Sequence, residues 1–179
     1  MADFYYLMSS LPMLRLGDTP QLSSEQLLEV CADKLSNGEL TTLKQLTLLP
    51  QADDLTDNSA IKAWNNWETC LRNRLAVRRS SADNSADEYL QYENDFFSEI
   101  DAVIQEAVAL ANPLECERHL DALRWRRLDD IESGIAFSFN ALCVYMIKLK
   151  LLEKWLPRDN DTGYENLDLA ITGINNAQH

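Results

Sequence analysis

A chain of 179 residues is long enough to bury an ordinary hydrophobic core, and its 5 glycines and 5 prolines are too few for a loop-rich or disordered protein. The formal net charge of −13 disfavours nucleic acid and anionic membrane surfaces as direct partners, because phosphate groups are bound by clustered lysine and arginine. The apolar run at 135–147 is shorter than the roughly 20 residues that cross a bilayer, and the N-terminal residues lack the basic start of a signal peptide. We therefore expect a cytoplasmic protein with no direct membrane insertion.

The first fifty residues predict short helices over 1–10, 24–35 and 36–49. Ser36 and Glu39 have the spacing of a capping box, in which the serine and glutamate side chains bond each other's backbone N–H groups. Proline at position 50 then stops the third helix, and a polar linker follows.

The segment 60–111 predicts a long antiparallel hairpin of two helices with opposite charge. In the first, over 61–79, five basic residues stand against Glu68 alone. The second is predicted over 86–111, and between Ser80 and Asn112 the chain has eight acidic residues and no basic one. Pairing the two helices would place acids beside bases and favour this arrangement over others.

The segment 112–175 predicts the remaining helices. Asn112 and Pro113 are typical of a helix start, and Gly134 of a helix end. The next helix follows after a short connection, within the stretch 134–156; its first half is apolar on all sides and so must be covered on every side. A last helix is predicted after a cap at Asp161. Together these elements predict an all-α fold in a single domain over 1–179: a compact bundle of about seven or eight helices with one long hairpin and a buried central helix.

Residues that could support catalysis are sparse. Asp53, Asp54 and Asp57 have the DDxxD spacing of magnesium-binding prenyl-diphosphate enzymes, but those enzymes need a second acidic motif, so we interpret the run as linker with Asp57 as a helix cap. His119 pairs with Glu115 at i, i+4, whereas a di-iron site requires two Glu-x-x-His motifs. We expect no cofactor, no metal and no enzymatic activity. The four cysteines are far apart and are interpreted as small buried side chains, namely Cys31, Cys70, Cys116 and Cys143.

A dense charged patch at 124–132 has two interpretations. Either it is a solvated helix face anchored by Trp125, or it is a partner surface, since arginine and tryptophan are typical interface anchors. Other exposed aromatic and arginine candidates occur earlier in the chain. The complete candidate partner surface comprises Tyr5, Tyr6, Arg72, Arg79, Arg124, Trp125 and Arg127.

Three blocks carry a resemblance to a known family: FYYLMSSLPML at 4–14, WNNWETCLRNRLAVRRS at 64–80, and the segment 112–155, which runs from NPLECERHL to LLEKW. They resemble a bacterial family of unknown function whose genes lie among those of V/A-type ATPases. That family is similar in turn to the C subunit of these ATPases, which is called the d subunit in eukaryotes. Counterparts of a helix in the C subunit are Trp67, Leu71, Arg72, Asn73 and Arg79.

The resemblance implies a non-catalytic structural subunit that couples the central stalk, formed by the D and F subunits, to the proteolipid ring of the membrane rotor. It also implies a position at the periphery of the inner membrane. The C subunit has three helical repeats, whereas 179 residues have room for about one repeat. The alternative is a stand-alone helical adaptor or regulator that forms a homodimer through the Arg124–Trp125 patch.

Overall fold

The computed structural model describes residues 4–50, 57–80, 90 and 97–156, and this part of the chain forms seven helices and no strand. The predicted all-α fold is therefore confirmed. The helices are α1 (Phe4–Ser10), α2 (Ser24–Ala32), α3 (Asn37–Gln45), α4 (Ser59–Arg79), α5 (Ser98–Ala109), α6 (Pro113–Glu132) and α7 (Phe139–Glu153).

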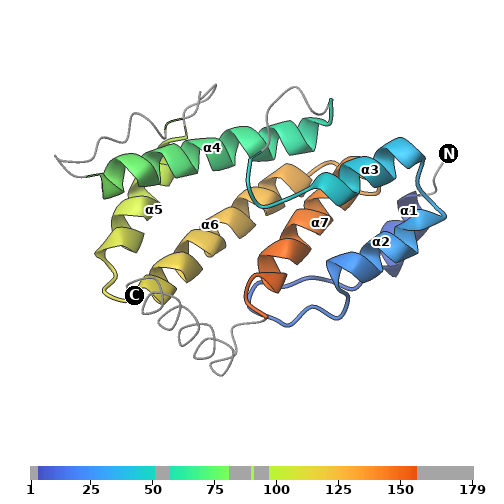
Figure 1. The fold of residues 1–179 in the computed structure, drawn as a ribbon, viewed down its shortest axis with the longest axis horizontal. Helices are drawn as coiled ribbons and strands as arrows, with labels where there is room; N and C mark the ends of the chain where they lie inside the picture. Colours follow the sequence, from blue (N-terminus) through green and yellow to red (C-terminus); the bar gives the residue numbers. More distant parts are fainter. Residues whose placement is uncertain (1–3, 51–56, 81–89, 91–96, 157–179) are drawn as a thin grey trace, which may run out of the picture.

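Helices α6 and α7 lie side by side and run in opposite directions, joined by the short connection 133–138 (Figure 1). Helix α4 packs against both of them, and α5 packs mainly on α6. Helices α2 and α3 contact each other and cover α7 from the other side. The antiparallel pair at the centre of the bundle is thus formed by α6 and α7.

The long hairpin predicted over 60–111 is only partly correct. Its first helix, α4, has the expected length, but α5 is much shorter than 86–111, because Leu90 and Phe97 lie outside any helix. Phe97 has an extended backbone, with φ −121° and ψ 99°, through which a helix cannot continue. One of the predicted charge pairs joins the two helices, with Arg74 Nε 3.9 Å from Asp101 Oδ1. Residues 86–89 and 91–96 of the predicted second helix, and the last helix predicted after Asp161, lie outside the described residues.

The predicted helix ends at Ser36, Asn112 and Gly134 are confirmed. The Ser36 Oγ accepts from the backbone N–H of Glu39 at 3.3 Å, and the Glu39 carboxylate accepts from the backbone N–H of Ser36 at 2.9 Å. The Asn112 side chain accepts from the second residue of α6, which begins with Pro113. Gly134 follows α6 with φ +88°, a conformation that side chains disfavour.

The cap predicted at Asp57 is wrong by one residue. Asn58 caps α4, because its Oδ1 accepts from the backbone N–H groups of Ala60 and Ile61 at 3.0 Å. The Asp57 side chain is exposed instead, with Oδ1 3.6 Å from the Lys62 Nζ. An asparagine side chain one position closer to the helix reaches the free N–H groups of the first turn, which leaves the aspartate in solvent.

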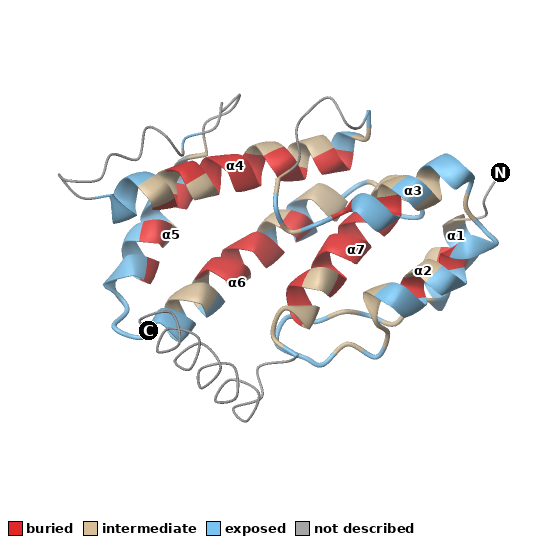
Figure 2. Ribbon diagram, viewed as in Figure 1, coloured by how far each residue is buried: buried red, intermediate tan, exposed pale blue. Residues whose placement is uncertain are grey.

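The buried central helix is confirmed as α7, whose residues 141–149 are buried without interruption (Figure 2). Trp64 and Trp67 of α4 stack against each other in this core, with ring centroids 5.9 Å apart. Even Lys148 is buried, with its ammonium 2.6 Å from Asp129 Oδ1 and also bonded to Glu132. None of the helices in the described part combines the length and hydropathy that a bilayer span requires.

Three of the four cysteines are buried as expected, whereas Cys116 is half-buried. Burial raises the pKa of the Cys143 thiol to about 12 and also raises the pKa of Cys31.

Because the thiolate is the reactive form, iodoacetamide at about pH 8 should modify only Cys116 in the folded protein and all four cysteines in urea. Peptide mass spectrometry would check this, with Cys116→Ser as the control that remains unlabelled. Rapid native labelling of Cys70 or Cys143 would contradict the buried core.

Candidate functional site

The seven candidate residues fall into three places in the structure. Tyr5 and Tyr6 are on the surface of α1, whereas Arg72 and Arg79 lie on one side of α4 and point into a hollow. The remaining three are on α6: Arg124 and Trp125 in the interior, and Arg127 at its edge. The sequence therefore identified residues of two separate surfaces and, in α6, residues of the core.

Arg124 is not a surface residue, and both interpretations of the α6 patch are wrong for it. Its side chain donates two hydrogen bonds of 3.0 Å to the Glu68 carboxylate of α4 and one of 2.8 Å to Asp121. The residue is 7% exposed, and both carboxylates are fully buried. Burial by itself would lower the pKa of Arg124, but the charges of Glu68 and Asp121 reverse that effect and raise it. Arg124 therefore binds α4 to α6 inside the molecule.

Trp125 is also buried, which corrects its prediction as an interface anchor. Its ring packs in the core with the Lys148 ammonium 5.4 Å from the ring centroid, a cation–π arrangement. Arg127 is half-buried, and its guanidinium carbon lies 5.2 Å from the centre of the Phe97 ring. The side of α6 that carries these residues faces its neighbours, because α4, α5 and α7 all pack against it.

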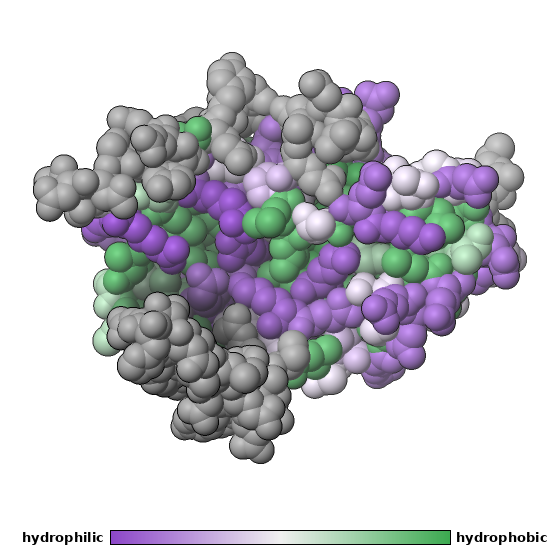
Figure 3. Space-filling view, in the orientation of Figure 1, coloured by the Kyte–Doolittle hydropathy of each residue, from purple (hydrophilic) through white to green (hydrophobic). Residues whose placement is uncertain are grey.

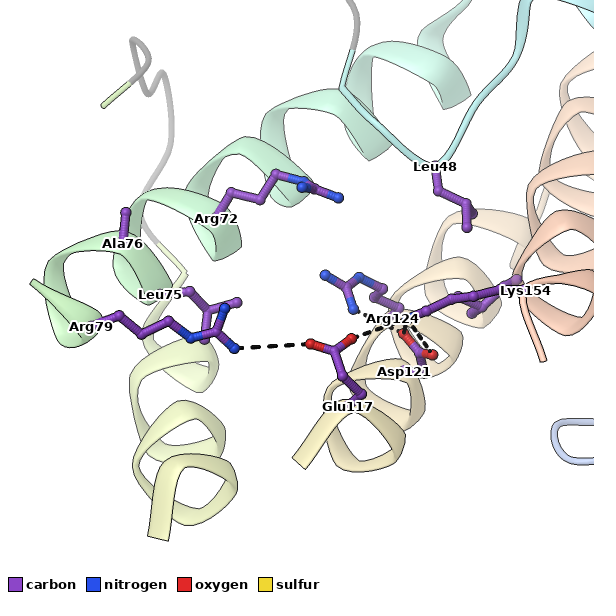
Figure 4. Close-up of a pocket in the computed structure, with 10 residues that line it drawn as sticks. Leu48, Arg72, Leu75, Ala76, Arg79, Glu117, Asp121, Arg124 and Lys154 are labelled. Carbon is purple, nitrogen blue, oxygen red and sulfur yellow. Dashed lines mark hydrogen bonds and ion pairs between the residues drawn. The ribbon is translucent and has the colours of Figure 1, made fainter. Parts of the chain in front are cut away.

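A hollow of about 420 Å³ opens between α4, α6 and the end of α7 (Figure 4). On the face shown in Figure 3, hydrophilic side chains gather where α4 and α6 lie opposite each other. We call this cavity the basic hollow, because four of its side chains are cationic. It is lined by Leu48, Arg72, Leu75, Ala76, Arg79, Glu117, Asp121, Arg124, Leu151 and Lys154.

The floor of the basic hollow is a closed network of charges. Asp121 accepts hydrogen bonds from Arg124, from the Lys154 ammonium at 2.9 Å and from the Trp155 indole Nε1 at 2.9 Å. Lys154 also donates to Glu117 at 3.1 Å. Burial would raise the pKa of Glu117, but the hydrogen bond from Lys154 and the neighbouring cations outweigh it and lower this pKa. Glu117 is therefore charged at neutral pH, and both it and Asp121 already accept hydrogen bonds from cations.

The two arginines on the α4 side of the hollow are less completely paired. Arg72 Nε lies 2.8 Å from Glu68 Oε1, yet it forms no hydrogen bond, so the contact is an ion pair whose N–H does not point at the oxygen. Arg79 reaches Glu117 only at 3.9 Å. Their side chains are 41% and 57% exposed. Among the described residues, these guanidinium groups have donors that remain available to a ligand.

A second surface feature is a cluster of three exposed aromatic rings, which we call the aromatic patch: Tyr5, Tyr6 and Phe137. Their exposed fractions are 57%, 71% and 49%. The Tyr5 ring lies 5.6 Å from that of Tyr6 and 4.8 Å from that of Phe137. Phe137 has φ +58°, an unusual conformation for a bulky residue. The candidate surface predicted from the sequence did not include Phe137. No residue pattern in the 133–138 connection indicates the positive φ of Phe137.

The described residues contain no group of three or more histidine, cysteine, aspartate or glutamate side chains that could hold a metal ion. His119 Nε2 of α6 is 3.3 Å from Glu106 Oε2, so the acidic residue beside this histidine belongs to a different helix, α5. Asp53 and Asp54 of the DDxxD run lie outside the described residues.

Among three comparisons with known proteins, only the one with family models found a match. A search of curated proteins and a search of solved structures each found no match. A family model described as "Protein of unknown function (DUF2764)" matches residues 84–175, just over half of the 179-residue chain. The match covers α5, α6 and α7, and so includes the helix pair at the centre of the bundle. The chain therefore belongs to the DUF2764 family.

Proposed function

We propose that this protein is a non-catalytic structural subunit of a V/A-type ATPase, similar to the C subunit, that couples the central stalk to the membrane rotor ring. The proposal starts from the resemblance of three sequence blocks, and the structural observation that carries it is the aromatic patch. In this role the protein is held at the membrane periphery by its partners, the D and F subunits of the stalk and the proteolipid ring.

The aromatic patch has the properties of a docking surface. Leaving Tyr5, Tyr6 and Phe137 in water forgoes the stabilisation that burial of aromatic rings provides, and the three rings are gathered at one place. Phe137 exposes its ring from a strained backbone conformation, and such strain is common at functional sites. Aromatic side chains are also frequent among the residues that dominate binding energy. The patch therefore supports a protein partner.

The interior of the molecule suits a mechanical role. Buried ionic hydrogen bonds run from Glu68 of α4 through Arg124 and Asp121 of α6 to Lys154, directly after α7. Displacing one helix from another would break hydrogen bonds to buried charged groups, so the three helices resist displacement relative to one another. A subunit that transmits torque requires such a stiff connection.

Replacing Tyr5 and Tyr6 together with serine should weaken association with the ATPase at least about tenfold, because each ring of a binding hot spot contributes about 2 kcal/mol or more. The measurement is the amount of ATPase that co-purifies with the tagged protein from its native host. Val77→Ser is the matched control: it removes an exposed apolar side chain, 53% exposed, at the far end of α4 from α1 (Figure 1).

Two results would refute the proposed function. One is a wild-type protein that does not co-purify with the ATPase. The other is an ATPase that assembles and couples ATP hydrolysis to ion transport normally when this chain is deleted. A homodimer without affinity for the stalk would instead support the adaptor alternative, although not through Arg124 and Trp125, because both are buried within one chain.

A further inference from the structure

We propose that the basic hollow binds a carboxylate side chain that a partner protein presents next to an apolar residue. This inference deepens the proposed function and rests on it for the identity of the partner, another component of the ATPase. The binding groups are the guanidinium groups of Arg72 and Arg79, on one side of α4 (Figure 4).

The charges of the basic hollow leave a positive excess. Four cations, Arg72, Arg79, Arg124 and Lys154, face three carboxylates, those of Glu117, Asp121 and the adjoining Glu68. Arg124 and Lys154 are taken up by the floor network. The unmatched charge therefore lies on the α4 arginines, in a protein whose overall net charge is −13. This local reversal of sign favours an anionic ligand.

The carboxylates that the described residues place at the hollow are already paired with cations, which disfavours a further cation there. Glu68 and Asp121 are fully buried and already accept hydrogen bonds from Arg124, and Glu117 accepts one from Lys154. The guanidinium group, in contrast, presents N–H donors in a planar fork that matches the two oxygens of a carboxylate. Arg72 and Arg79 are seven positions apart on α4, about two helical turns, so both can face the same hollow.

The shape and lining of the hollow indicate a peptide segment as its occupant. Its volume of about 420 Å³ lies within the range of roughly 300 to 1,000 Å³ that is typical of pockets for organic ligands, and a bare inorganic ion would leave most of it filled with water. Apolar side chains, Leu48, Leu75, Ala76 and Leu151, line it together with the arginines. A segment that carries an acidic residue beside an apolar one satisfies both kinds of surface.

Site-specific photo-crosslinking in native host cells tests this inference and identifies the partner in the same experiment. Benzoylphenylalanine is placed at Leu48 in one strain and at Ala76 in another, so that a folding defect in one variant does not decide the result. Both positions line the hollow, Leu48 from the segment after α3 and Ala76 from α4. We expect both to crosslink to the same segment of another protein, and mass spectrometry should find aspartate or glutamate in it.

The arginine dependence of the crosslink is measured with Arg79→Gln and with Arg72→Gln/Arg79→Gln. Loss of charge-assisted hydrogen bonds should reduce the crosslink at least about tenfold. Arg78→Gln is the matched control for the single variant, because it makes the same charge change at an exposed position of α4 outside the lining of the basic hollow, and it should leave the crosslink unchanged.

The outcomes separate this inference from the proposed function. A crosslinked acidic segment in a component of the ATPase supports both. An acidic, arginine-dependent segment in a different protein supports a carboxylate site in the hollow and refutes the ATPase role. The inference is overturned by absence of a protein crosslink from both positions, by a segment without an acidic residue, or by a crosslink that persists in Arg72→Gln/Arg79→Gln.

Discussion

Replacing Arg124 with methionine should lower the free energy of unfolding by about 3 to 5 kcal/mol, the usual cost of removing one partner from a buried ion pair. The substitution leaves the Glu68 carboxylate buried with only the poorly aligned contact from Arg72. Asp121 keeps its hydrogen bonds to Lys154 and Trp155, so the main loss is at Glu68. Urea denaturation followed by circular dichroism measures the change.

A matched control lies two residues along the same helix. Arg126 is exposed, and Arg126→Met should change the free energy of unfolding by no more than about 0.5 kcal/mol. Glu68→Met/Arg124→Met should cost much less than the sum of the two single substitutions, because it removes both buried charges together. If Arg124→Met were as mild as Arg126→Met, Arg124 would not be bound in the interior as the structure has it.

Replacing Trp67 with alanine should destabilise the protein by about 3 to 5 kcal/mol, the range for truncating a large aromatic side chain in a core. Trp67 is fully buried and stacks against Trp64, with an angle of 28° between the ring planes. The truncation removes this stacking and leaves a cavity between α4 and the helices packed on it. Thermal and urea unfolding measure the loss.

Trp67→Phe distinguishes packing from hydrogen bonding at the same position. The indole Nε1 atoms of Trp64 and Trp67 have no hydrogen-bond partner among the described residues, so removing one N–H breaks no such bond. Phenylalanine keeps most of the ring contact, and its cost should be well under half that of Trp67→Ala. Equal costs for the two substitutions would show that ring packing is not what stabilises this position.

Local signals in the sequence were enough to predict the helices that begin and end with a characteristic residue. The capping box at Ser36 and Glu39, the Asn112–Pro113 start and the glycine at 134 act on their own first or last turn, so their effect does not depend on the rest of the fold. The prediction of a helix over 86–111 was correct only for the part that α5 occupies, because residue spacing could not show that Phe97 has an extended backbone.

The burial of α7 follows from the sequence alone, because a helix that is apolar on all sides has no face to present to water. The role of α6 emerged only from the packing of the helices, since the charged patch at 124–132 was interpreted either as a solvated face or as a partner surface. Arg124 is instead bonded to Glu68, which lies 56 positions away in the chain. The aromatic patch also depends on tertiary packing. Phe137 contacts Tyr5 because α1 packs beside the 133–138 connection. Contacts between distant segments depend on how helices pack. The periodicity of one helix shows which of its residues share a face, but not which other segment that face contacts.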